Sequence, residues 1–196
     1  MSTQTDGLAV ASELRATGAR RRWRRLPTYV AALALWAGVL CLADRGPLWP
    51  GILSLAIGQA IQLWAAGVLP CPKNSALVSG GPYACVRNPM YVGRLFVGLG
   101  LVLLTWRWYV VAGHVALFPL YAHLRVQREE RRLRKAFGGE YDEYCRRVHR
   151  WLPTWPERGR LTGAWSPAST WRYGQAFVAI ALVVVVVTVI LRRAWG

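Results

Sequence analysis

Long apolar stretches alternate with short, strongly basic segments along this chain. A run of about 17 to 25 residues with few or no charges is long enough to cross the hydrocarbon core of a bilayer as a helix. We identify five such runs, at 26–43, 46–72, 90–106, 108–124 and 173–191. Arg94 interrupts the third run near its start, where its long side chain can reach the membrane surface. The pattern predicts an all-α integral membrane protein with about five transmembrane helices.

The charges are concentrated between the apolar runs, because charged residues make up only 17% of the chain while the net charge is +16. Six basic residues lie in 15–25, three in 73–94 and eleven in 125–160, whereas the alternate loops carry only Arg45 and Arg107. Basic loops are retained in the cytoplasm. The N-terminus and both central basic segments are therefore predicted to be cytoplasmic, and the arginine- and alanine-rich composition favours a bacterial inner membrane.

The same pattern divides the chain into five parts. Residues 1–25 are predicted to form a basic, partly disordered tail, and 26–72 to form two transmembrane helices. Residues 80–153 contain a transmembrane helical hairpin followed by a cytoplasmic helix, 154–172 form a linker, and 173–196 form a C-terminal transmembrane helix. A cleaved signal peptide is the alternative for the first apolar run, but no small-residue cleavage pattern follows it.

The basic excess could indicate a nucleic-acid partner, and the cysteines and histidines could indicate a bound metal. Arginines beside a membrane set its topology and attract anionic lipid headgroups, so the charge requires no nucleic acid. The four cysteines and three histidines lack the spacing of metal ligands. We therefore expect the lipid bilayer as a partner, no nucleic acid and no metal.

Between 80 and 153, polar and charged residues lie directly beside the apolar runs. The first group contains the sequences Gly-Gly-Pro-Tyr at 80–83 and Val-Arg-Asn-Pro-Met-Tyr at 86–91. Its glycines and prolines end the preceding helix, while Asn88 suits an N-cap and Pro89 the first turn of the next helix. The free N–H groups of that turn can hold polar ligand atoms. The alternative is a plain capped helix entry.

The second group lies where the chain returns from the membrane. Arg125 and Glu129 are four residues apart and share one helix face, and the predicted helix continues to Lys135 beyond the bilayer. This charged stripe at the membrane edge is a candidate site. An ordinary surface helix with ion pairs between successive turns is the alternative.

A third group follows along the chain and includes Glu130, Phe137-Gly138 and Arg147. Together the three groups resemble the C-terminal region of the isoprenylcysteine carboxyl methyltransferase family. The wider group includes phospholipid methyltransferases. The resemblance covers residues 80–153 and implies S-adenosyl-L-methionine as methyl donor, bound in a cytosol-facing pocket, with a lipophilic or lipidated acceptor entering from the bilayer. It also implies the following cofactor-binding residues: Tyr83, Val86, Arg87, Asn88, Tyr91, Gly98, Gly100, Glu130, Tyr141 and Tyr144.

Within that resemblance, Arg125 and Glu129 are the predicted catalytic residues. A carboxylate acceptor is already ionised near neutral pH and needs a cation to orient it, which suits the planar guanidinium of Arg125. Glu129, one turn away, would hold Arg125. If the acceptor is a phenol or an amine, Glu129 becomes the candidate base.

Carboxyl O-methylation is the favoured reaction, with phospholipid N-methylation and phenolic-lipid O-methylation left open. Many family members have histidine where this chain has Asn88, so a proton-linked role is lost there. A membrane reductase that uses NADPH and a non-catalytic membrane scaffold are the remaining alternatives. The role of the last apolar helix, which lies beyond the motifs, is not determined by the sequence.

Overall fold

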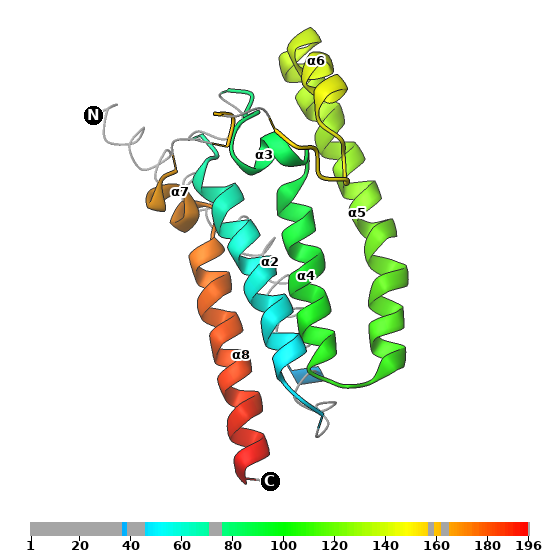
Figure 1. Cartoon of the computed structure of the whole chain (residues 1–196), viewed down its shortest axis with the longest axis vertical. Helices are drawn as coiled ribbons and strands as arrows, with labels where there is room; N and C mark the ends of the chain where they lie inside the picture. Colours follow the sequence, from blue (N-terminus) through cyan, green and yellow to red (C-terminus); the bar gives the residue numbers. More distant parts are fainter. Residues whose placement is uncertain (1–36, 39–45, 71–75, 157–158, 162–164, 196) are drawn as a thin grey trace, which may run out of the picture. The chain divides into compact units, whose positions relative to one another are not determined.

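The computed structural model describes residues 37–38, 46–70, 76–156, 159–161 and 165–195. The chain divides into two units, Met1–Cys41 and Leu42–Gly196, and all helices discussed here belong to the second (Figure 1). In chain order these are α2 (Trp49–Gly67), α3 (Pro82–Cys85), α4 (Pro89–Leu103), α5 (Trp108–Phe137), α6 (Gly139–Arg147), α7 (Pro167–Arg172) and α8 (Gln175–Trp195). The described residues contain no strand, which confirms the predicted all-α class.

Helices α2 and α4 pack against each other at very short range because glycines line their contact (Figure 1). A Cβ atom on Gly58 would lie 2.6 Å from the carbonyl oxygen of Gly93, and one on Gly100 would lie 2.7 Å from that of Gly51. Small residues at a helix contact let the backbones approach, which is how helices associate inside a bilayer. Ser54 adds a hydrogen bond from its hydroxyl to the carbonyl oxygen of Phe96.

Helix α5 begins and ends where the sequence predicts. The stretch 104–107 forms the expected tight connection after α4, with Trp106 at a positive φ of 52° and its indole N–H donating to the carbonyl oxygen of Pro47. From Trp108 the helix runs without a break past Arg125 to Phe137. Gly138 ends it at φ 52°, a backbone region that favours glycine. The charged stripe therefore continues the apolar first part of α5 directly.

The segment predicted as a linker is held against the helices and contains α7. The hydroxyl of Ser169 donates to the carbonyl oxygen of Leu69, and that of Tyr173 donates to the carbonyl oxygen of Pro70. At the other end of α8, Arg193 donates to the carbonyl oxygens of Gly46 and Leu104. Helix α8 is thus anchored at both ends, and it also packs against α2.

Among the described helices, α8 alone is both long and apolar enough to cross a membrane, while α4 is apolar but shorter. Large apolar side chains are exposed along α2, α5 and α8, as expected for surfaces in contact with lipid. The predicted span at 26–43 lies outside the described residues, apart from 37–38. The number of five spans, the cytoplasmic orientation and the disordered tail therefore stay predictions.

Candidate functional site

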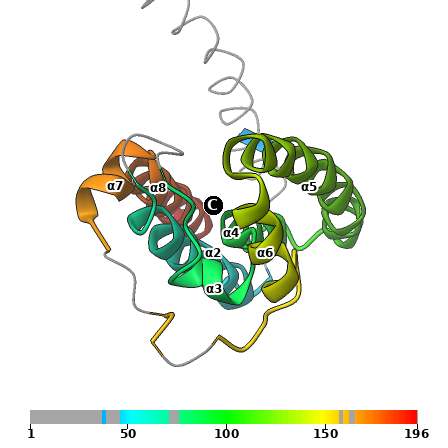
Figure 2. The same cartoon turned by 90° about the horizontal axis from the view of Figure 1, so that it is seen from above.

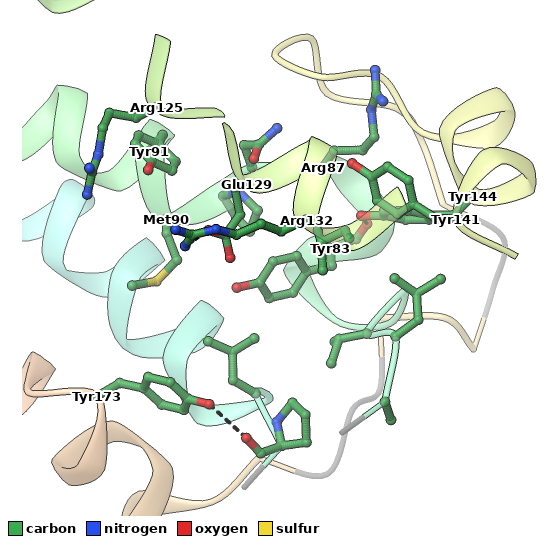
Figure 3. Close-up of a pocket in the computed structure, with 18 of the residues that line it drawn as sticks. Tyr83, Arg87, Met90, Tyr91, Arg125, Glu129, Arg132, Tyr141, Tyr144 and Tyr173 are labelled. Atoms are coloured by element: carbon green, nitrogen blue, oxygen red, sulfur yellow. Dashed lines mark hydrogen bonds and ion pairs between the residues drawn. The ribbon is translucent and has the colours of Figure 1, made fainter. Parts of the chain in front are cut away.

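A pocket of about 340 Å³ lies where α3, α4, α5 and α6 meet the beginning of α8. Figure 2 shows α3 and α6 in front of the ends of α2 and α4, and Figure 3 shows the side chains that line the pocket. Its volume falls within the range of about 300–1,000 Å³ that is usual for small-molecule sites. Eight of the predicted site residues line it: Tyr83, Arg87, Asn88, Tyr91, Arg125, Glu129, Tyr141 and Tyr144.

One face of α5 forms a charged wall of the pocket. Arg125, Glu129, Arg132 and Leu133 all line it, and their spacing of four, seven and eight residues from Arg125 places them on one side of a helix. Arg125 is exposed, and the carboxylate of Glu129 lies 4.0 Å from the guanidinium of Arg132. The wall therefore offers several cations and one carboxylate to a ligand.

The entry to α4 forms the adjoining wall. Asn88 occupies the predicted N-cap position before Pro89, but its side chain makes no capping hydrogen bond. Instead its amide nitrogen Nδ2 is buried and has no hydrogen-bond partner among the described residues. The guanidinium of Arg94 lies 4.7 Å from the ring centroid of Tyr91, so the tyrosine face already interacts with a cation here. Unpartnered buried polar groups beside a cavity are points where a ligand can bind.

Glu130 does not line the pocket, although it was predicted to contact the cofactor directly. Its side chain is only 7% exposed and accepts two hydrogen bonds from Arg150, one of 3.0 Å from Nε and one from Nη2. Arg87, which does line the pocket, lies with Nη1 3.5 Å from the same carboxylate and also donates to the sulfur of Cys145. Glu130 thus acts on the pocket through Arg87.

The tyrosines of α6 line the pocket near the ion pairs that Glu130 makes with Arg87 and Arg150. Tyr141 and Tyr144 are buried with Val148, and the hydroxyl of Tyr144 donates to the carbonyl oxygen of Tyr83. Burial raises the pKa of Tyr83, Tyr141 and Tyr144, and the negative charge of Glu130 raises that of Tyr141 further. All three phenols are therefore neutral near pH 7 and serve as hydrogen-bond donors and ring surfaces rather than as bases.

Three other predicted cofactor residues also lie outside the lining. Val86 is buried in the connection between α3 and α4. A Cβ atom on Gly98 would meet the imidazole of His114 at 2.3 Å, and Gly100 packs against the backbone of Gly51. The structure therefore gives both glycines a role in helix packing, a common role of glycines in membrane helices.

Several lining residues were missed by the sequence reasoning. Met90 and Arg94 follow Asn88 on α4, and Arg132 follows Glu129 by less than one turn of α5, so helical spacing alone could have identified them. Tyr173 is the C-cap residue of α7 and Gln175 the first residue of α8, and no motif marks them. Arg150, which holds Glu130, lies in the irregular segment after α6.

The arrangement can bind a small molecule that carries both a positive and a negative charge. Arginines suit a carboxylate, Glu129 suits an amine or hydroxyls, and the rings of Tyr83 and Tyr91 suit a cationic or planar group. Buried, unpartnered nitrogens at Asn88 and Arg87 add hydrogen-bond donors. Among the described residues, no three side chains of His, Cys, Asp or Glu converge in the manner of a metal site.

Residues 47–140 match the phospholipid methyltransferase family. The match begins at α2 and ends just before Tyr141, so it covers the helices that build the charged walls but not α6 or α8. It confirms the resemblance predicted from the motifs, because this family is related to the isoprenylcysteine carboxyl methyltransferases.

Two curated relatives are named for metal resistance. The chain is 32% identical over 140 residues to the cobalt-zinc-cadmium resistance protein CzcN of Cupriavidus metallidurans. The aligned residues are 67% of this chain and 62% of the relative. It is 32% identical over 104 residues to the nickel-cobalt-cadmium resistance protein NccN of Alcaligenes xylosoxydans xylosoxydans, covering 53% and 48%. The chain thus spans about half to three fifths of these relatives. No solved structure matches the chain.

Proposed function

We propose that this chain, whose residues 47–140 match the phospholipid methyltransferase family, transfers a methyl group from S-adenosyl-L-methionine to a lipophilic acceptor in the membrane. The observation that supports this most directly is the buried Nδ2 of Asn88, which has no partner among the described residues and belongs to a pocket with charged walls. A ligand that accepts this hydrogen bond would remove the cost of an unpaired buried donor.

The residues present fit the cofactor. Its carboxylate suits the arginines of the pocket, its amine and ribose hydroxyls suit Glu129, and its sulfonium suits the face of a lining tyrosine ring such as that of Tyr83. When bound, the cofactor supplies a methyl group on a positively charged sulfur, and in-line attack forms the new bond as the sulfur–carbon bond breaks. The protein's task is then to orient the two reactants and to exclude water.

Arg125 is proposed to position the acceptor, and a carboxylate is the acceptor that suits it best. It lines the pocket from the exposed, membrane-proximal part of α5, and its guanidinium can donate two parallel hydrogen bonds to a carboxylate. Oxygen methylation then needs no base, because the carboxylate gives up its charge as the ester forms. With a phenol or a phospholipid amine, Glu129 is the lining carboxylate that would take the proton.

A part in metal resistance is the second candidate function, favoured by the names of the two relatives. We propose that any such part follows from methylation of an envelope component. Cells that express the Arg125→Lys variant should then lose cadmium tolerance together with methyl transfer. Full tolerance with an inactive variant would separate the two functions.

Binding of the cofactor is tested by calorimetry on the full chain purified in detergent. We expect wild-type protein to bind S-adenosyl-L-methionine and Asn88→Ala to bind it more weakly by about 1–3 kcal/mol, since a buried hydrogen bond is lost. Gln127→Ala, on α5 but outside the pocket lining, is the matched control and should bind normally. Binding of NADPH in place of S-adenosyl-L-methionine would refute the proposal and favour the reductase alternative.

A further inference from the structure

The lining of the pocket has two chemically different parts. The charged walls come from α4 and α5, whereas a neutral part of the lining includes Leu69, Pro70, Tyr173 and Gln175. Figure 3 shows Arg125 and Tyr173 at opposite edges of the lining, with Met90 between them. The charged walls hold the proposed cofactor and, at Arg125, the reacting group of the acceptor, so the neutral part of the lining is available to another part of the acceptor.

Gln175 is the polar group of this neutral part of the lining. It is the first residue of α8, is only 5% exposed, and its side-chain oxygen Oε1 is buried without a hydrogen-bond partner among the described residues. No hydrogen bond from the described residues therefore holds this oxygen, and Gln175 lines the pocket. Native proteins pair nearly all of their buried polar atoms, so this exception needs an explanation.

Gln59 on α2 supports Gln175 from behind. It is 8% exposed, and its amide nitrogen Nε2 donates a hydrogen bond of 3.1 Å to the backbone carbonyl oxygen of Gln175. Only the amide nitrogen of Gln59 can donate to that carbonyl, so this contact fixes which end of the Gln59 amide is the oxygen. The Oε1 of Gln59 is also buried without a partner in the described part of the chain. Two neighbouring buried amides thus each leave an acceptor oxygen unpaired.

We propose that Gln175 recognises a hydrogen-bond-donating group, a hydroxyl or an ammonium, in the head group of the lipophilic acceptor, and that Gln59 positions it. This inference rests on the proposed methyl transfer, because only then is the recognised lipid a methyl acceptor. A carbonyl oxygen can pair only with a donor, so a group without N–H or O–H is disfavoured there. The donating group is distinct from the atom that Arg125 orients, since Arg125 belongs to α5 and Gln175 to the start of α8.

The position of Gln175 suits a molecule that lies in the membrane. The residues that follow it on α8 include Phe177 and Val178, whose side chains are exposed, and the exposed apolar surface continues along the helix. A lipid chain can therefore lie along α8 while its head group reaches the pocket. This gives α8, which lies outside the family match, a role in selecting the acceptor.

The test measures lipid binding to the full chain in detergent, with matched pairs of short-chain lipids as probes. One pair is phosphatidylethanolamine, whose ammonium donates, and phosphatidylcholine, whose ammonium does not. The other is a monoacylglycerol, whose hydroxyls donate, and the methyl ester of the same fatty acid. We expect wild-type protein to bind at least one donating lipid about tenfold more tightly than its matched control, a factor typical of one hydrogen bond. The pair that shows the preference identifies the donor as ammonium or hydroxyl.

The Gln175→Met variant keeps the length of the side chain and removes its oxygen, so the preference should disappear while affinity for S-adenosyl-L-methionine stays normal. Its melting temperature should be unchanged or higher, because an unpaired buried oxygen is removed; a purely structural glutamine would give a lower one. Gln59→Leu should weaken the preference, and Gln127→Leu should keep it. If Gln175→Met fails to fold, Gln175→Leu takes its place.

Equal binding of both members of each pair by the wild type, or a preference that survives in Gln175→Met, would overturn the inference. A loss of S-adenosyl-L-methionine affinity in Gln175→Met would also overturn it, by placing Gln175 on the cofactor side. If the wild type binds no S-adenosyl-L-methionine but shows a lipid preference that depends on Gln175, the proposed methyl transfer fails while the head-group site stands.

Discussion

Replacing Glu130 with glutamine should destabilise the whole end of the protein that contains the pocket. The carboxylate of Glu130 on α5 accepts hydrogen bonds from Arg150, beyond α6, and lies beside Arg87, before α4. Glutamine keeps the size of the side chain but loses its charge, so both guanidinium groups lose their common anion. Arg87 is 15% exposed and cannot regain much water, whereas Arg150 is 31% exposed and can turn outward.

The expected magnitude follows from these exposures. Removing one partner of a fully buried ion pair costs about 3–5 kcal/mol, and an exposed pair is worth about 0–1 kcal/mol. Because the carboxylate is buried and one of its two partners is partly solvated, we expect a loss of about 2–3 kcal/mol. For a chain of this size that corresponds to a fall in melting temperature of roughly 5–10 °C. The measurement is thermal unfolding of the purified protein in detergent.

Two further variants show whether the cluster is the cause. Glu143→Gln is the control, because Glu143 pairs with Arg146 and Arg147 on the exposed face of α6 and should leave the melting temperature close to that of the wild type. The double variant Glu130→Gln/Arg150→Gln should lose less than the sum of its single variants, since the two residues act as one pair. A Glu130→Gln protein with the melting temperature of the wild type would refute the reasoning.

The remaining predictions concern topology, pH and the acceptor. In a cysteine-free background, a membrane-impermeant thiol reagent added from the periplasmic side should label Arg107→Cys but not Arg134→Cys, and the reverse pattern would invert the predicted orientation. Stability should fall as the pH rises above 10.0, because burial keeps the folded Tyr83 protonated while the unfolded chain loses that proton, and Tyr83→Phe should reduce the fall. Arg125→Lys should lower turnover of a carboxylate acceptor at least about tenfold without weakening cofactor binding, and parallel losses would place Arg125 in the cofactor site.

The local structure around the motifs was predictable because it depends on short-range rules. Asn88-Pro89 marks the start of α4, the apolar and then charged periodicity carries α5 from Trp108 past Arg125, and Gly138 ends it. Residues on one face of α5 must share a neighbour, so the charged wall of the pocket follows from spacing alone. The family match confirms the resemblance that those motifs carried.

What the sequence could not predict depends on contacts between distant segments. Whether Glu129 or Glu130 faces the pocket is decided by the 100° step between adjacent helical residues and by Arg150, which lies 20 residues further along. Gly98 and Gly100 look like a cofactor motif until the positions of His114 and Gly51 are known. The contribution of α8 to the lining was likewise invisible, because a uniformly apolar helix gives no sign of what its first residue contacts.

Transfer of a labelled methyl group into membrane lipid tests the central claim most directly. Membranes of the source organism that contain the overproduced protein are incubated with S-adenosyl-L-methionine labelled on its methyl group, and the products are extracted into organic solvent. We predict label in the organic phase with the wild type, less label with Asn88→Ala when S-adenosyl-L-methionine is below saturation, and none with membranes that lack the protein. An organic phase that stays unlabelled, although the purified protein binds S-adenosyl-L-methionine, would contradict the central claim.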